Sequence, residues 1–230
     1  PFRCRMGRPC AGDCSGVGAH FTRRGGLAFD SAQTSMRRAA RLRGMMAAME
    51  AHSVGTLWTI GHSTRPWEVF ADMLDAAGIE VLADVRRFAG SRRYPQYSRD
   101  VMPVELAESG IRYWPLPAMG GRRKPLPESP NTAWRVEAFR AYADYLADPE
   151  YIAAREALMA VARTERTCVM CAEAVWWRCH RRLIADDFVA RGWTVLHLLA
   201  PGKTEPHVLN PDAVMIDGVL RYPGPQPSLL

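Results

Sequence analysis

Five short apolar runs, separated by segments with helical spacing, constrain the fold of this 230-residue chain more than any other feature. The second run is mostly apolar, as expected of a strand that is covered on both faces. Strands that alternate with helices form a mostly parallel sheet. The sequence therefore predicts an α/β fold: a single three-layer domain whose mostly parallel five-stranded sheet carries helices on both faces. The five strands are expected at 57–61, 79–85, 111–116, 167–173 and 193–199.

The segments between the runs contain signals for helix starts and ends. After the first run, Pro66 stands in an expected first turn, Phe70, Met73 and Leu74 recur at helical spacing, and Gly78 marks the end. Similar patterns predict further helices at 101–109, 134–147, 150–164 and 178–190.

Charge is distributed unevenly along the chain. Lys and Arg number 30 against 24 Asp and Glu, which gives a formal charge of +6. Residues 1–53 hold nine Arg and three acidic residues and account for all of it, so the remainder balances 21 basic against 21 acidic residues. The basic character belongs to a segment at 1–53 and not to the domain expected at 54–230. The net charge therefore does not by itself predict a polyanionic partner for the domain.

Three explanations fit the segment at 1–53. It is a basic disordered arm, a transit peptide, or a reading frame extended upstream of a true start at Met45, Met46 or Met49. No apolar run approaches the roughly 18 residues that span a bilayer, so no membrane association is expected. Three of the six cysteines cluster between residues 168 and 179, which does not resemble a disulfide framework. We therefore expect a cytoplasmic protein.

Polar side chains follow the first two runs. His62 and Ser63 come after the first run, and Asp84, Arg86 and Arg87 end or follow the second. In parallel sheets, ligands bind in the crevice beyond the carboxyl ends of the strands. His62 is a candidate acid or base, and the other four residues are candidate ligand-binding groups.

The fourth run ends in Cys171 and Glu173, and the next helix is expected to begin around Cys179, His180 and Arg181. A helix N-terminus favours anions and lowers a thiol pKa, which makes Cys179 a candidate nucleophile. The alternative is a small buried residue that packs under the helix, which is the usual role of a free cysteine. Cys171 is a core residue or a second reactive thiol, and Glu173 is an ion-pair partner or an acid/base.

Arginine is the residue type that best suits an anionic ligand here. Guanidinium groups bind phosphate or carboxylate as a bidentate fork, and Arg86, Arg87, Arg122 and Arg181 are the candidates. His180 stands beside the last of them. The glycines at 120–121 allow a close backbone approach, but the phosphate-loop pattern is absent.

Four residues between 168 and 180 have side chains that can bind a metal ion. Cys168, Cys171, Cys179 and His180 offer soft ligands. However, positions 168 and 171 face opposite sides of a strand, and positions 179 and 180 diverge by about 100° on a helix. No metal site is therefore predicted.

Several motifs together resemble the family known as domain of unknown function 488, over about residues 57–222. The motifs are Thr59-Ile-Gly-His-Ser-Thr64, Asp84-Val-Arg-Arg-Phe88, Gly90-Ser-Arg-Arg93, Gly120-Gly-Arg-Arg123, Phe139-x2-Tyr142-Ala143-x-Tyr145, Met170-Cys-Ala-Glu173, Cys179-His-Arg181, and His207 with Asp217-Gly218 and Tyr222-Pro223. Two departures are Ala89 and Trp176, where the family usually has Pro. The resemblance implies a compact cytosolic α/β domain and leaves the reaction open.

We expect an enzyme, a hydrolase or group transferase, that acts on a phosphate-bearing nucleotide or nucleic-acid component. Glu173 or His62 would act as acid or base, and Cys179 or Cys171 as nucleophile or orienting group. The alternatives are a non-catalytic module that binds nucleic acid or a small anionic ligand, and a metal-dependent site. The sequence identifies no cofactor and leaves the oligomeric state open.

Overall fold

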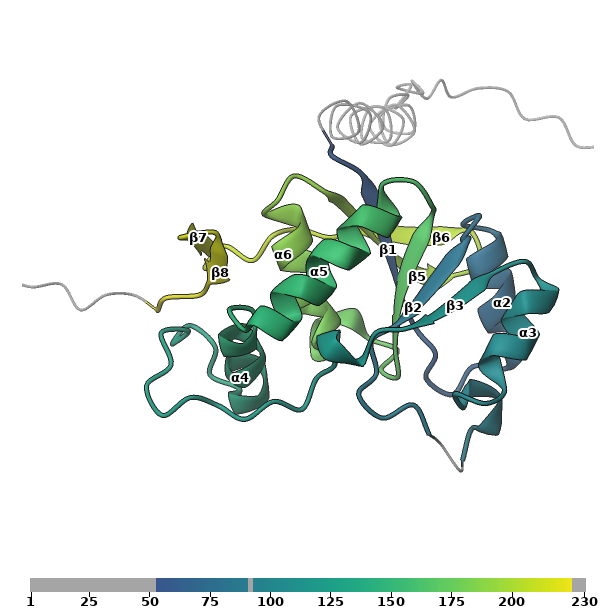
Figure 1. Ribbon diagram of the computed structural model, residues 1–230, viewed down its shortest axis with the longest axis horizontal. Helices are drawn as coiled ribbons and strands as arrows, with labels where there is room; N and C mark the ends of the chain where they lie inside the picture. Colours follow the sequence, from purple (N-terminus) through teal and green to yellow (C-terminus); the bar gives the residue numbers. More distant parts are fainter. Residues whose placement is uncertain (1–52, 91–92, 225–230) are drawn as a thin grey trace, which may run out of the picture. The chain divides into compact units, whose positions relative to one another are not determined.

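A computed structural model describes residues 53–90 and 93–224 of the chain (Figure 1). The segment predicted as a basic extension lies outside the described residues, except for Ser53. The main sheet has six strands in the order β3-β2-β4-β1-β5-β6. They are β1 (Thr56–Gly61), β2 (Val81–Asp84), β3 (Arg112–Pro115), β4 (Thr167–Cys171), β5 (Thr194–Ala200) and β6 (Lys203–Pro206). The first five pair in parallel, which confirms the predicted mostly parallel α/β fold.

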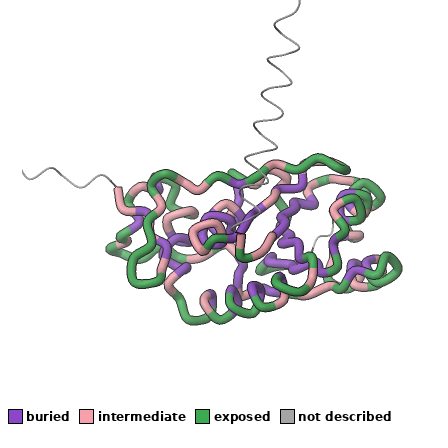
Figure 2. The backbone as a smooth tube through the Cα atoms, turned by 90° about the horizontal axis from the view of Figure 1, so that it is seen from above, coloured by how far each residue is buried: buried purple, intermediate pink, exposed green. Residues whose placement is uncertain are grey.

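Helices cover both faces of the sheet, as predicted. On one face lie α2 (Trp67–Asp75) and α3 (Met102–Glu108), and on the other lie α4 (Glu137–Tyr145), α5 (Pro149–Ala162) and α6 (Arg181–Val189) (Figure 1). Figure 2 shows buried backbone along the strands between these layers. Alternate residues of each strand enter opposite cores: Val169 and Cys171 join the α5 and α6 side, whereas Cys168 and Met170 join the α2 and α3 side.

Three strands lie outside the predicted five. β6 pairs antiparallel with β5 at the edge of the sheet, and β7 (Val214–Ile216) and β8 (Val219–Arg221) form a separate hairpin. Lys203–Pro206 is polar because it lies at the edge of the sheet, where one of its sides has no partner strand. Such a composition does not predict a strand. The sequence contains a signal for the hairpin, the pair Asp217-Gly218. These residues have φ of 49° and 76°, as a two-residue turn with two left-handed positions requires.

The chain leaves the neighbouring strands β1 and β4 towards opposite faces. After β1 it enters α2, and after β4 it passes through a 3-10 turn, η3 (Trp176–Arg178), into α6. In sheets of this kind, ligands bind beyond the carboxyl ends of the strands. α6 begins at Arg181, so Cys179 and His180 precede the helix instead of lying within it.

Across the part of the chain that the structure describes, no helix is long and apolar enough to cross a membrane.

Candidate functional site

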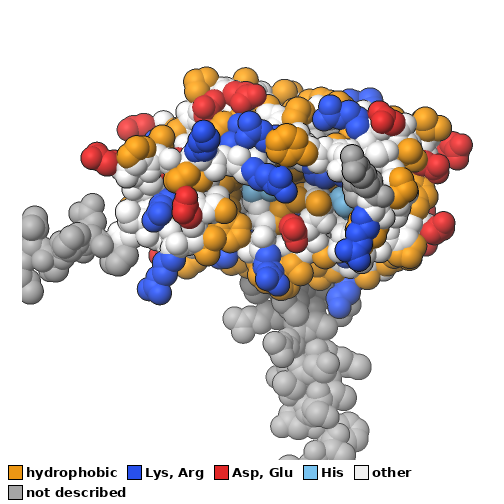
Figure 3. All heavy atoms as spheres, turned by 90° about the horizontal axis from the view of Figure 1, so that it is seen from below, with side chains coloured by type: hydrophobic (Ala, Val, Ile, Leu, Met, Phe, Trp, Pro, Cys, Tyr) orange, Lys and Arg blue, Asp and Glu red, His pale blue; other side chains and the backbone are white. Residues whose placement is uncertain are grey.

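A cavity of about 420 Å³ lies at the carboxyl ends of β2 and β4. Its walls come from the segment after β2, the loop at 121–122, α4, and the segment between Cys171 and His180. Figure 3 looks onto this edge of the sheet, where Lys and Arg side chains are prominent across the middle of the face. The cavity is therefore a concave, positively charged site at the position that the fold favours for ligands.

Two thiols lie together in the wall of the cavity. Sγ of Cys171, the last residue of β4, is 2.9 Å from Sγ of Cys179, and both residues are buried. Burial opposes ionisation of Cys179, but the hydrogen bond from Cys171 and the charge, backbone N–H and side chain of Arg181 outweigh it. Together they lower the pKa of Cys179 to about 7. The same hydrogen bond, with burial, raises the pKa of Cys171 to about 12. At pH 7 about half of the Cys179 side chains are therefore thiolate, whereas Cys171 keeps its proton.

His180 completes this cluster. Its Nδ1 lies 3.5 Å from Sγ of Cys179, and its ring centre lies 5.1 Å from that of Tyr142 on α4. A Cβ atom at Gly121 would come within 3.0 Å of the same Nδ1, so glycine lets the loop pass close to the imidazole. Nε2 of His180 is buried and has no hydrogen-bond partner among the described residues.

The cavity wall carries more arginines than carboxylates. Arg87, Arg122 and Arg178 line it and are exposed, and within residues 53–90 and 93–224 none forms an ion pair. The guanidinium carbons of Arg87 and Arg122 lie 5.8 and 5.7 Å from the ring centre of Phe88, which is 66% exposed. Glu173 is an exposed carboxylate in the same wall, with no ion pair or hydrogen bond from its side chain to described residues. This wall suits an anion beside a flat ring.

A second polar cluster, at the end of β2, is closed. Arg86 binds both carboxylate oxygens of Asp84, at 2.9 and 2.7 Å, and lies 3.1 Å through Nη1 from Nε2 of His62. Tyr113 donates a hydrogen bond of 2.6 Å to the same carboxylate. The His62 ring stacks on Tyr97 at 4.2 Å. Burial and the charge of Arg86 lower the pKa of His62 to about 4, so the imidazole is neutral at pH 7.

Arg181 has a structural position. It is 1% exposed, and its guanidinium donates to the carbonyl oxygens of Glu173 and Ala174 and to Oγ1 of Thr59. A Cβ atom at Gly61 would lie 1.8 Å from the Glu173 carbonyl oxygen, so the end of β1 can pass under this turn because residue 61 is glycine. Arg181 thus holds the turn between β4 and η3 and acts on the site through its charge on Cys179.

Seven of the eleven residues predicted for the site line the cavity. They are Arg86, Arg87, Arg122, Cys171, Glu173, Cys179 and His180. The other four lie outside its wall: His62, Ser63, Asp84 and Arg181. The expectation that Arg181 binds a ligand does not fit its burial and its bonds to the backbone. Ser63 has a positive φ of 50° and donates its N–H to the carbonyl of Ala172, which joins the segments after β1 and β4.

Seven wall residues were not predicted as site residues, and the larger ones are Phe88, Arg178, Phe139 and Tyr142. Phe139 and Tyr142 are spaced by three positions on α4, a signal for one helix face, but the sequence does not show that this face meets the crevice. Arg178 precedes Cys179 directly and could have been included on that ground.

A buried hydrogen-bond chain behind the site was also missed. Asp186 on α6 binds Nε2 of His207 at 2.8 Å, His207 contacts His197 at 3.0 Å, and His197 contacts Thr59 at 2.7 Å. The ring of Trp176 stacks on His197 at 4.1 Å with an interplanar angle of 9°. The indole of Trp176 therefore links η3 to β5. His197 is buried, and these two contacts make it a hydrogen-bonded core histidine.

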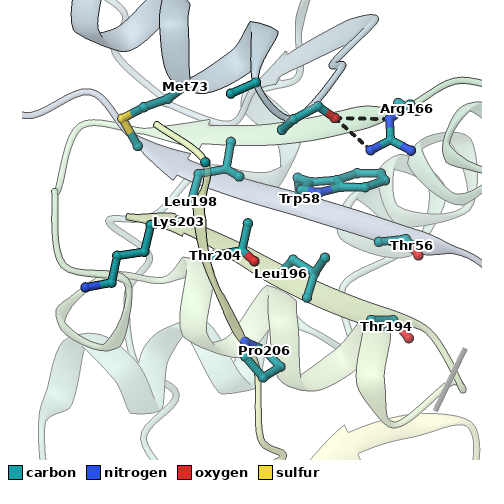
Figure 4. A pocket seen from close by; sticks show the side chains of 13 residues that line it. Thr56, Trp58, Met73, Arg166, Thr194, Leu196, Leu198, Lys203, Thr204 and Pro206 are labelled. Carbon is teal, nitrogen blue, oxygen red and sulfur yellow. Dashed lines mark hydrogen bonds between the residues drawn. The ribbon is translucent and has the colours of Figure 1, made fainter. Parts of the chain in front are cut away.

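A second hollow, of about 330 Å³, lies against β1, β5 and β6 (Figure 4). Arg166 lies 4.3 Å from the ring centre of Trp58 there and donates two hydrogen bonds to the carbonyl oxygen of Ala77. The wall is otherwise aliphatic or hydroxyl-bearing, apart from Lys203, and its residues include no Cys, His or carboxylate. This hollow therefore lacks the thiol, imidazole and carboxylate groups of the first cavity, and the thiol-bearing cavity is the candidate for chemistry.

Three residues of the cavity could hold a metal ion. Ligand atoms of Cys171, Cys179 and His180 lie within 4.8 Å of one another. The predicted divergence of positions 179 and 180 does not occur, because neither belongs to the body of α6, whereas Cys168 faces away as expected. Sulfurs that bind zinc at about 2.3 Å in a tetrahedron lie roughly 3.8 Å apart, so this pair would have to open by about 0.9 Å. The positive charge of Arg181 also opposes a cation here.

The fold and the cavity define an α/β protein with a paired thiol in a positively charged crevice. Residues 66–188 match the family described as Domain of unknown function DUF488, and the chain belongs to this family. The match includes all seven predicted residues that line the cavity. No curated protein and no solved structure matches the chain.

Proposed function

We propose that the protein is an enzyme, a hydrolase or group transferase, which acts on a phosphate-bearing nucleotide or nucleic-acid component in this cavity. One observation carries the proposal: a thiol with a pKa near 7 lies in the same wall as three arginines without ion pairs. A thiolate is nucleophilic at neutral pH, and guanidinium groups bind phosphate oxygens.

Each group has a role in this proposal. Cys179 attacks the substrate, and Arg87, Arg122 and Arg178 hold its anionic part. The exposed ring of Phe88, which has the guanidinium carbons of Arg87 and Arg122 5.8 and 5.7 Å from its centre, stacks on a base. Glu173 is the acid/base, because its carboxylate reaches the cavity. His62 is the weaker candidate, because it lies outside the cavity wall and is stacked on Tyr97.

A thermal-shift screen of nucleosides and their mono-, di- and triphosphates tests the proposal. A ligand at about 100 times its dissociation constant stabilises the folded state by roughly 2.7 kcal/mol. Phosphorylated compounds should raise the melting temperature, and the parent nucleosides should not. Arg87→Ala and Arg122→Ala should each reduce the shift. Arg112→Ala is the matched control, because Arg112 is an exposed arginine at the amino end of β3. If the ligand raised the melting temperature of all three variants equally, Arg87 and Arg122 would not be the residues that bind its phosphate.

Turnover separates the enzyme from a non-catalytic binding module. Products should form from a compound found in the screen, and Cys179→Ser should abolish their formation while the thermal shift persists. Binding without turnover in the unaltered protein would favour a module for small anions or nucleic acid. If nucleic-acid affinity then disappears on removal of residues 1–53 and depends steeply on salt, the basic segment and not the cavity is responsible.

A metal-dependent site is a second candidate, favoured by the cluster of Cys171, Cys179 and His180. Elemental analysis of the protein, purified without chelators, distinguishes the two chemistries. Stoichiometric zinc or iron that is lost in Cys179→Ser would replace the nucleophile in the proposal with a metal ligand. We also propose a cytoplasmic location, where thiols stay reduced.

A further inference from the structure

The two thiols at the end of β4 are arranged for a reaction with each other. Their sulfur atoms lie 2.9 Å apart, and a disulfide bond measures about 2.05 Å, so a shift of about 0.9 Å would join them. The residues are eight positions apart, on a strand end and on the residue after a 3-10 turn. Neither side chain lies within a helix, so the turn between them can absorb this movement.

The two sulfurs differ in reactivity. Cys179 is the more acidic thiol of the two, because the hydrogen bond from Cys171 and the charge of Arg181 outweigh the effect of burial and lower its pKa. Cys171 keeps its proton. An oxidant therefore reacts first at Cys179, since the thiolate is the nucleophilic form, and the neighbouring thiol is in place for the second step.

The third cysteine of the domain is separated from the pair. Cys168 stands on the opposite face of β4, in the core that α2 and α3 cover, and burial raises the pKa of its thiol. Cys171 and Cys179 instead line the open cavity. Among the described cysteines, these two can both meet a small solute and reach each other.

We propose that Cys171 and Cys179 form a redox-active pair that a small hydroperoxide converts to an intramolecular disulfide. The Cys179 thiolate attacks one peroxide oxygen: an S–O bond forms, the O–O bond breaks, and the other oxygen leaves with a proton as an alcohol. Cys179 becomes a sulfenic acid, oxidised by two electrons, and the hydroperoxide is reduced. The sulfur of Cys171 then attacks that of Cys179: the S–S bond forms, the S–O bond breaks, and the proton of Cys171 leaves with the hydroxyl as water.

This reaction needs no substrate of the proposed enzyme and goes beyond its function. It also protects the nucleophile, because a disulfide returns to two thiols with a thiol reductant, whereas a sulfinic acid does not under ordinary conditions. A disulfide at this place would remove the thiolate from the cavity wall and leave the arginines where they are.

Peptide mapping of the full chain tests the proposal directly. The reduced protein is treated with tert-butyl hydroperoxide, its free thiols are alkylated, and it is digested with trypsin without reductant. Cleavage after Arg178 separates the peptide that contains residues 167–178 from the peptide 179–181. The expected product is a linked pair of these two peptides that lacks two hydrogens, formed at least tenfold more in the unaltered protein than in Cys171→Ala.

The longer peptide contains Cys168 and Cys171, and a variant of each shows which one forms the disulfide bond with Cys179. Cys168→Ala is the matched control and should give the same linked pair. Cys171→Ala should instead leave a sulfenic acid at Cys179 that dimedone captures, and circular dichroism should show that both variants are folded. A linked pair that persists in Cys171→Ala and vanishes in Cys168→Ala would overturn the proposal. So would equal formation of sulfinic acid at Cys179 with and without Cys171. The readout involves no turnover, so this proposal and the proposed function can fail independently.

Discussion

Two groups of titratable side chains occupy the carboxyl edge of the same sheet, and they differ in how their charges are matched. At the end of β2, the Arg86 guanidinium lies against the Asp84 carboxylate and beside a neutral His62, all of them buried. At the end of β4, Cys179 and Glu173 share a cavity wall with exposed arginines. In the first group, the closed cluster, the polar side chains bind one another. In the second group, the open cluster, the arginines of the cavity wall are exposed to solvent. We therefore expect changes in the closed cluster to affect stability and changes in the open cluster to affect reactivity.

The largest effect is expected when the ion pair of the closed cluster is broken. Asp84→Ala leaves the guanidinium of Arg86 buried without its carboxylate, and the loss of one partner of a buried pair costs about 3–5 kcal/mol. Urea unfolding measures this free energy. Glu165→Ala is the matched control: it breaks an ion pair to Arg112 whose side chains are 39% and 48% exposed, and it should cost less than about 1 kcal/mol. If both variants lost a similar free energy of unfolding, the pair of Asp84 and Arg86 would be no more important for stability than an exposed ion pair.

The pH dependence of stability should also report the closed cluster. The pKa of His62 is about 4 in the folded protein and about 6.5 when unfolded, so between these values the unfolded chain binds more protons. The free energy of unfolding should therefore fall as the pH is lowered from 6.5 to 4, by on the order of 3 kcal/mol from His62. Burial and the charge of His207 lower the pKa of His197 to about 2, which adds a decrease of the same sign.

His62→Gln separates these contributions. The variant should lose part of the decrease between pH 6.5 and 4 in equilibrium unfolding, and the part that belongs to His197 should remain. Its absolute stability is a poor measure, because the substitution also removes the ring stacked on Tyr97. Equal pH dependence in both proteins would show that His62 titrates normally in the folded state.

A smaller effect is expected in the open cluster when the second thiol is removed. Cys171→Ala takes away a hydrogen bond that stabilises the Cys179 thiolate, so the pKa of Cys179 should rise. A rise of one unit from about 7 would reduce the thiolate fraction at pH 7 by about fivefold. The rate of iodoacetamide alkylation at Cys179, followed across pH, measures this change. Cys168→Ala should leave the profile unaltered, and an unchanged profile in Cys171→Ala would argue against the hydrogen bond.

The closed and open clusters also differ in how far the sequence could predict them. Apolar runs and helical spacing were enough for the α/β fold, because burial on both faces of a parallel sheet leaves a clear pattern. They also brought Cys171, Glu173 and Cys179 to one edge of the sheet. The closure of the Arg86 cluster depends on which side chain reaches Asp84, and spacing along the chain does not determine that.

Long-range packing explains the remaining differences. Phe139 and Tyr142 reach the cavity because α4 packs beside the end of β4, a contact between segments about thirty residues apart that no local pattern encodes. Arg181 was expected at the ligand because arginine at a helix start suits an anion. Its guanidinium instead donates hydrogen bonds to the backbone carbonyl oxygens of Glu173 and Ala174.

The smallest effect is expected for the carboxylate of the open cluster, and it is the most direct test of the comparison. Glu173→Gln keeps the size of the side chain and removes its charge. Within the described residues this carboxylate has no ion pair to lose, so the free energy of unfolding should change by no more than about 0.5 kcal/mol. Turnover of a substrate should nevertheless fall, because Glu173 is the proposed acid/base. A stability loss of 2 kcal/mol or more, as expected for a paired buried carboxylate, would place Glu173 with Asp84 as a structural group and leave the cavity without an acid/base.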